Sequence, residues 1–182
     1  MAEAGRRRAQ VIVRKATDAD LDDLVRMAVE LQDHVEASNP KIWHMSEAGR
    51  RSKRVEMMDA LRDPEGMVVV ATGGEGELVG MATGRILRKE EMTVKVAGSI
   101  ERVIVRKKWR GGGIGTRLVA ALSSFFDEKG VGDITVRYVL GNVEGETFWK
   151  GLGFEPRIEI ANIGPGKLRQ ELKKLMGSDE TP

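Results

Sequence analysis

Apolar residues recur with helical spacing in three parts of the chain. The first part follows cap-forming residues 17–20 and runs to about Ala37, before Asn-Pro at residues 39–40; its apolar members are Leu21, Leu24, Val25, Ala28, Leu31 and Val35. The second part lies within residues 41–62, where one face carries Val55, Met58 and Leu61. The third part ends near Gly130; its members are Ile114, Leu118, Ala121, Leu122 and Phe125. This spacing predicts three amphipathic helices.

Short runs of β-branched and apolar residues predict strands between and beyond these helices. The runs cover residues 11–14, 67–72, 78–87, 93–105, 133–139 and 158–163. Glycines within residues 73–76 predict a hairpin that joins the second and third runs. Two further helices are predicted over residues 144–150 and 167–176.

The order of these elements indicates the fold class. Three consecutive strands favour antiparallel pairing, whereas the strand–helix–strand unit of residues 100–139 favours a right-handed parallel crossover. We therefore expect an α/β (α+β) fold, in which helices flank both faces of a mixed, mostly antiparallel central sheet. For domain organisation, we expect a disordered basic tail over residues 1–9, a single domain over 10–164, and a C-terminal helix and tail over 165–182.

Composition narrows the classes of function. The chain has no Cys, which excludes disulfides, thiolate metal sites and a Cys nucleophile. Its net charge of +2 arises from basic residues interleaved with acidic ones, and aromatic residues are only 4%, so a nucleic-acid-binding module is disfavoured. No apolar run is long enough to span a membrane or to form a signal peptide after the arginines at residues 6–8. We expect a cytoplasmic protein without membrane or nucleic-acid partners.

A basic, glycine-rich loop follows the strand that ends in residues 103–105. It reads Arg-Gly-Gly-Gly-Ile-Gly-Thr over residues 110–116 and opens the third amphipathic helix. Glycines and a helix N-terminus present backbone N–H groups that suit a phosphate, and Arg110 adds a forked cation. A plain tight turn is the alternative interpretation. The loop lacks the Lys of a nucleotide-binding P-loop, and Thr116 stands where a dinucleotide fingerprint has its third Gly.

Two motifs carry a resemblance to a known family. Arg110, Gly113 and Gly115 fit R-x-x-G-x-G after the strand of residues 98–105. A second pattern, N-x-x-A-x-x-F-Y-x-x-x-G-F, is matched by Asn142, Gly145, Phe148, Trp149, Gly153 and Phe154. Over about residues 11–160 the chain resembles the GNAT superfamily of acyl-CoA-dependent N-acyltransferases. The resemblance implies an N-acetyltransferase that moves an acetyl group from acetyl-CoA to a primary amine by direct attack, without a metal.

The resemblance also implies where acetyl-CoA, the co-substrate, binds. Its pantetheine arm would lie between the fourth and fifth strands and pair with the backbone of Val103, Ile104 and Val105. Its pyrophosphate would be held by Arg110, Gly111, Gly112, Gly113, Ile114, Gly115 and Thr116. Asn142 would hydrogen-bond the arm from the other side, and Trp149 would line the site. Three basic residues could attract the remaining phosphate or face solvent: Arg106, Lys107 and Lys108.

The candidate catalytic groups are Glu101 and Tyr138, and a packed strand residue is the alternative interpretation of Tyr138. Period-2 alternation in a regular strand would place Glu101 on the same face as Ser99 and Val103, where its carboxylate could take the amine proton; an ion-paired surface Glu is the alternative. Trp149 stands where the family usually has Tyr, and an indole N–H does not usefully give up its proton. Three interpretations stay open: Trp149 orients the sulfur, Tyr138 is the acid, or the thiolate leaves unassisted.

The acceptor is an amine whose identity the sequence leaves open. The family's acceptor segment corresponds to residues 34–45, which include His34, Trp43 and His44, and we expect neither His to bind a metal. The acids that precede this segment would attract a cationic amine or serve the helix dipole. A protein N-terminus, a lysine, a polyamine, an antibiotic amine and a small metabolite are all candidates. The sequence is also compatible with a homodimer, and a non-catalytic acyl-CoA sensor is the competing hypothesis for the same fold.

Overall fold

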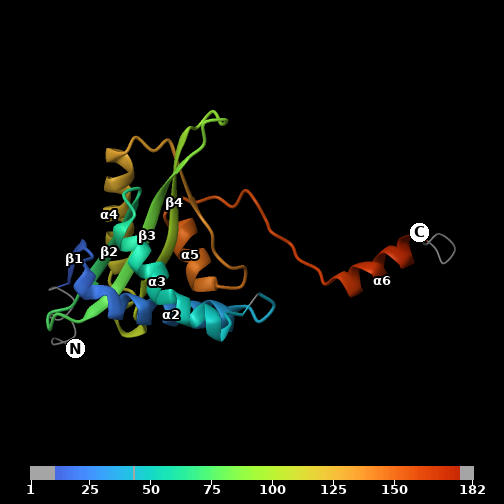
Figure 1. The fold of residues 1–182 in the computed structure, drawn as a ribbon, viewed down its shortest axis with the longest axis horizontal. Coiled ribbons are helices and arrows are strands. Elements are labelled where there is room, and N and C mark those ends of the chain that lie inside the picture. Colours follow the sequence, from blue (N-terminus) through green and yellow to red (C-terminus); the bar gives the residue numbers. More distant parts are fainter. Residues whose placement is uncertain (1–10, 43, 177–182) are drawn as a thin grey trace. The chain divides into compact units, whose positions relative to one another are not determined.

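The computed structural model describes residues 11–42 and 44–176. The chain divides into two compact units, residues 1–146 and 147–182. Helix α5 (Val143–Gly151) crosses the boundary between them. Figure 1 traces the elements of each unit along the chain.

The first unit contains a five-stranded sheet in the order β1-β2-β3-β4-β5. Strands β1 to β4 pair antiparallel with their neighbours, and β5 pairs parallel with β4. The bounds are β1 Ile12–Lys15, β2 Gly66–Thr72, β3 Leu78–Arg88, β4 Val96–Val105 and β5 Asp133–Val136. The predicted mixed, mostly antiparallel sheet is confirmed, as is the β2–β3 hairpin. Strand β5 ends three residues earlier than the prediction of 133–139.

Helices cover both faces of this sheet, as predicted. On one face, α2 (Leu21–Ser38) and α3 (Glu47–Arg62) bury their apolar side chains against the strands. Their shared core consists of Leu24, Met27, Ala28 and Met57 packed with Val68, Val70, Met81 and Ile104. The face of α3 differs from the prediction: Met57 is the buried residue, with Ala60 and Leu61 beside it, whereas Val55 is 54% exposed. Met57, Ala60 and Leu61, at the helical spacing i, i+3 and i+4, form the face of α3 that packs against the core.

On the opposite face, α4 (Ile114–Glu128) lies directly against β3 and β4. At Gly84 an added Cβ would lie 2.8 Å from Phe126 Cζ and 3.2 Å from the Ser99 carbonyl oxygen. Only glycine allows the strand and the helix to approach this closely. Phe126, Leu118 and Leu122 are fully buried here, so this face is tightly packed.

The connection from β1 to α2 passes through a short 3₁₀ helix, η1 (Asp18–Asp20), and is held by one buried carboxylate. Asp20 accepts two hydrogen bonds from the Arg14 guanidinium, both 2.8 Å long, and a third of 2.8 Å from the Thr17 backbone N–H. The hydrogen bonds from Arg14, which outweigh the effect of burial, lower the pKa of Asp20 from 3.8 to about 2. The carboxylate is therefore ionised at neutral pH, and its hydrogen bonds hold Arg14 of β1 and Thr17 together in the turn that precedes α2.

A β-bulge interrupts the pairing of β3 with β4. Thr83 pairs with Arg102, but the next residue, Gly84, pairs with Ile100, so Glu101 is the extra residue. Because paired residues point to the same face, Ser99 and Val103 lie on opposite faces of the sheet. The expectation that Ser99, Glu101 and Val103 share one face is wrong, since the bulge shifts the alternation.

The second unit contains the end of α5 and the helix α6 (Pro165–Met176), which was predicted. Trp149 packs edge-on against Phe148 and Phe154, with ring centroids 4.9 and 5.4 Å apart. The predicted strand over residues 158–163 is wrong, because these residues form no strand. Ile158 and Ile160 are 90% and 71% exposed. An alternating pattern makes a strand only where a partner strand pairs with it.

Candidate active site

The outer edge of β4 becomes free where β5 ends. The last pair between the two strands is Ile100 with Val136, yet β4 continues to Val105. Among the described strands, Val103, Ile104 and Val105 therefore pair only with β3. Backbone groups on a free edge can bind an extended ligand as an added strand.

The glycine loop follows this free edge and leads into α4. Between them lies a 3₁₀ helix, η2 (Lys107–Trp109). Gly113 is the N-cap of α4 and has φ +73°, a conformation that glycine adopts without strain. The N–H groups of Ile114, Gly115 and Thr116 are in the first helical turn and have no partner within the helix. The loop thus presents backbone donors and the positive end of a helix dipole to an anion.

Arg110 lies between the end of β4 and the start of α5. Its Nε donates a 3.0 Å hydrogen bond to the Val105 carbonyl, and its Nη1 pairs with the Glu144 carboxylate. His34 of α2 approaches the same carboxylate at 3.8 Å. The guanidinium is therefore next to the loop, where an incoming phosphate would compete with Glu144 for it.

The three basic residues after β4 have different surroundings. Arg106 is directed to α2, where its Nη2 lies 3.6 Å from Glu30 and 3.9 Å from Asp23. Lys107 and Lys108 lie in η2 and are exposed to solvent.

Glu101, the candidate base, occupies the bulge immediately beyond the last β4–β5 pair. Its side chain is exposed, and its Oε2 lies 3.6 Å from Arg102 Nη1. Arg102 in turn contacts Glu56 of α3 at 3.1 Å. The ion-paired state is thus the one observed, and it puts a carboxylate where the free edge of β4 begins.

The remaining candidates have distinct surroundings. Asn142 caps α5, because its Oδ1 accepts a 3.1 Å hydrogen bond from the Gly145 N–H. Tyr138 is half-buried and lies just beyond the end of β5 rather than within it. Trp149 is buried and belongs to the second unit.

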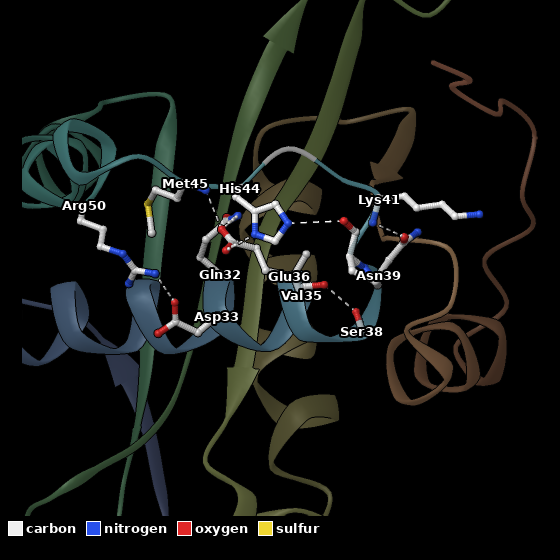
Figure 2. Close-up of polar contacts among 11 residues, drawn as sticks. Gln32, Asp33, Val35, Glu36, Ser38, Asn39, Lys41, His44, Met45 and Arg50 are labelled. Atoms are coloured by element: carbon white, nitrogen blue, oxygen red, sulfur yellow. Dashed lines mark hydrogen bonds and ion pairs between the residues drawn. The ribbon is translucent and has the colours of Figure 1, made fainter. Parts of the chain in front are cut away.

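The predicted acceptor segment, residues 34–45, is organised around Glu36, which sequence reasoning did not single out (Figure 2). The Glu36 carboxylate accepts hydrogen bonds from the Met45 N–H at 2.7 Å and Gln32 at 2.8 Å, and it lies 3.1 Å from His44 Nδ1. These contacts, with the Met45 N–H as the largest, lower the pKa of Glu36. Trp43 lies outside the described residues. A residue nine positions away supplies the main contact, so no local sequence signal marks Glu36.

Residues 34–45 also form a hydrogen bond to the chain beyond β5. Asn39 Nδ2 donates a 2.9 Å hydrogen bond to the Leu140 carbonyl. Within the described ranges, no cluster of three or more acidic or His residues has the geometry of a metal site, and no helix is long and apolar enough to cross a membrane.

Comparison with known proteins identifies the family. Residues 28–154 match the model of the acetyltransferase (GNAT) family, which is more than half of the chain. The chain is 29% identical to an aminoglycoside N(6')-acetyltransferase type 1 of Stenotrophomonas maltophilia over 103 residues, which are 55% of this chain and 67% of that protein. This chain belongs to the GNAT acetyltransferase family.

Solved structures share the fold. A tetramutant of the BH1408 protein from Bacillus halodurans has a TM-score of 0.74 at 17% identity, over 84% of this chain and 99% of that one. An aminoglycoside N-acetyltransferase, AAC(6')-Iy, in complex with CoA has a TM-score of 0.67 at 15% identity, over 85% and 94% of the two chains. The protein is an acyltransferase, and the expected GNAT-like fold is confirmed.

Proposed function

We propose that this acyltransferase holds acetyl-CoA along residues 101–105 of β4 and at the N-terminus of α4, and acetylates a primary amine of a small molecule. The observation that carries the proposal is the continuity of two features. The strand edge is free beyond Ile100, and the same segment leads within a few residues to the loop of unpaired N–H groups. An extended arm and a pyrophosphate need these two surfaces in this order.

The residues of the site support direct transfer. The backbone N–H of Ile104 or Val105 would polarise the thioester carbonyl. Glu101 would accept the proton that the attacking nitrogen loses, directly or through water. The nitrogen forms a bond to the carbonyl carbon, the carbon–sulfur bond breaks, and one proton passes from nitrogen to sulfur. The products are an N-acetyl amine and free CoA.

The proton donor to the leaving sulfur is a separate question. A thiol has a pKa near ~8.5, so the thiolate can leave unassisted and take its proton from water. Trp149 would not supply this proton, because an indole N–H is too weak an acid. Turnover against pH for Tyr138→Phe and Trp149→Phe tests this. Loss of an alkaline limb in Tyr138→Phe alone would make Tyr138 the acid.

The aminoglycoside acetyltransferases among the relatives support an amine-bearing small molecule as acceptor. The test is release of CoA thiol from acetyl-CoA across a panel of amines that includes an aminoglycoside, an aliphatic diamine and a peptide with a free N-terminus. We expect turnover with small amines and a strong loss of kcat in Glu101→Gln. If the protein binds acetyl-CoA in calorimetry but none of the amines in the panel leads to release of CoA thiol, the proposed function is wrong.

A further inference from the structure

A cavity of about 420 Å³ opens beside the β-bulge, on the face of the sheet that α3 covers. The later half of α3, the start of β2 and the central parts of β3 and β4 form its walls. Its volume is within the range of roughly 300–1,000 Å³ that is typical of small-molecule sites. Glu101 lines this cavity, so the cavity reaches the point where β4 separates from β5.

One wall carries two carboxylates at the C-terminal end of α3. Asp59 lies in the last turn of α3, Asp63 is its C-cap residue with an extended backbone, and both line the cavity. The negative end of the helix dipole makes carboxylates unfavourable at this position. Asp63 accepts a 2.9 Å hydrogen bond from the Glu65 N–H, but neither carboxylate has a cation within ion-pair distance among the described residues. A bound ammonium group would offset the negative charge of these carboxylates.

The floor of the cavity carries a buried hydroxyl without a partner. Thr83 is 1% exposed, and its Oγ1 makes no hydrogen bond with any described residue. A buried polar atom without a partner destabilises a fold, so such atoms are few in native proteins. Thr83 lines the cavity and pairs across the strands with Arg102, the neighbour of Glu101. A ligand nitrogen in the cavity would supply the missing hydrogen bond.

The remaining charged groups of the wall leave an excess of negative charge. Glu56 is matched by Lys53 at 2.7 Å and by Arg102 at 3.1 Å. Glu101 lies 3.6 Å from Arg102, which thus serves two carboxylates. Arg85 is the other cation of the lining, so the lining holds four carboxylates and two guanidinium groups. A cationic ligand therefore fits this cavity better than an anionic one.

We propose that the cavity is the acceptor site and that it selects diamines and polyamines. One ammonium group lies between Asp59 and Asp63, and a second, neutral amino group lies beside Thr83 and Glu101. There its nitrogen bonds to the acetyl carbonyl carbon as the carbon–sulfur bond of acetyl-CoA breaks, and one proton passes from nitrogen by way of Glu101 to the thiolate. This inference rests on the proposed function, because the acetyl group must come from acetyl-CoA.

The first experiment compares butane-1,4-diamine with n-butylamine as acceptors. We expect wild type to prefer the diamine. Asp59→Asn and Asp63→Asn should each lower kcat/KM for the diamine about tenfold, the usual effect of losing one charge-assisted contact, and change n-butylamine less than about twofold. Glu47→Gln, which removes an exposed carboxylate of the same helix outside the cavity, is the matched control and should change neither. Equal losses for both amines, or no loss for either, would overturn the proposal.

The second experiment measures diamine binding without acetyl-CoA, by calorimetry. Binding of butane-1,4-diamine should weaken in Thr83→Val and be retained in Thr83→Ser. Circular dichroism shows whether each variant is folded. If acetyl-CoA binds but no amine releases thiol, the proposed function fails, while loss of diamine binding in Asp59→Asn still supports the cavity as a diamine site. Failure of the diamine to bind wild type, or equal binding to wild type and Asp59→Asn, overturns the inference.

Discussion

Thr83 and Gly84 are neighbours in β3, yet they face two very different environments. Gly84 faces α4, where Phe126 and the Ser99 carbonyl leave no room for even one methyl group. Thr83 faces α3, where its hydroxyl has no partner among the described residues and a cavity of about 420 Å³ opens. We infer from this contrast that the α4 face supports the strands and that the α3 face is the one available to a ligand.

The bulge at Glu101 connects these two faces. It adds one residue to β4 without a counterpart in β3, at the position where β5 stops pairing. A carboxylate and a free strand edge are thereby brought to the same place. The closed face fixes this geometry, because α4 holds β3 and β4 through contacts that tolerate little change in volume.

The largest expected effect comes from opening the closed face. Phe126→Ala would leave a cavity under Gly84 and Gly98, both of which approach the Phe126 ring closely. We expect unfolding free energy to fall by about 3–5 kcal/mol, as for other buried Phe→Ala changes. Urea denaturation measures it. Val55→Ala on the α3 side, at a side chain 54% exposed, is the control and should change stability by less than about 0.5 kcal/mol. A similar loss in both variants would remove the contrast between the faces.

The closed face was largely predictable from the sequence, and the open face was not. The apolar spacing from Ile114 to Phe125 predicts α4, and the glycines of residues 73–76 predict the hairpin that it covers. No glycine or proline lies in residues 99–103 of β4 to mark the bulge, which results from the pairing of two strands. Period-2 alternation therefore put Ser99 and Val103 on one face, wrongly.

Prediction of the candidate site from the sequence was limited in the same way. The glycine loop is local, and its residues could be recognised in order along the chain. The cavity combines residues from α3, β2, β3 and β4, and the role of Glu36 depends on a contact with Met45 across a loop. The strand expected over residues 158–163 failed for a related reason, since alternation does not show whether a partner strand is present.

The stability of the α2–α3 side of the sheet should depend on pH through Asp20. Asp20 has a pKa of about 2 in the folded chain against an ordinary 3.8, so its contribution is complete above about pH 4 and is lost as pH falls through about 2. This difference corresponds to about 2 kcal/mol, which Asp20→Asn should remove at pH 7. Stability of the variant, measured by urea denaturation from pH 2 to 7, should lack that acid loss. Asp18→Asn, an exposed acid of the same 3₁₀ helix, should keep it; identical profiles for both variants would contradict the assignment.

The glycine loop that joins β4 to α4 should affect ligand binding. Gly113→Val would place a branched side chain at φ +73° and obstruct backbone approach to a pyrophosphate. We expect the acetyl-CoA affinity, measured by calorimetry, to fall at least about tenfold, equivalent to about 1.4 kcal/mol. Gly76→Val imposes similar backbone strain at φ +82° in the β2–β3 turn, away from the loop, and should bind acetyl-CoA normally. Undiminished affinity in Gly113→Val would put the pyrophosphate elsewhere.

The smallest expected effect has the opposite sign and tests the open face directly. Thr83→Val replaces the unpartnered hydroxyl with a methyl group of similar size, so it removes a buried polar atom that no described residue satisfies. Without ligand, we expect the variant to be as stable as wild type or more stable by up to about 1 kcal/mol, because the lost hydroxyl made no hydrogen bond to lose. The adjacent change Gly84→Ala should destabilise by about 1–3 kcal/mol, since its Cβ would overlap Phe126. Thermal denaturation of both variants gives the comparison. If Thr83→Val destabilises as much as Gly84→Ala, its hydroxyl serves the fold and the two faces of the sheet do not differ as described; if it stabilises while weakening diamine binding, the hydroxyl is retained for the ligand.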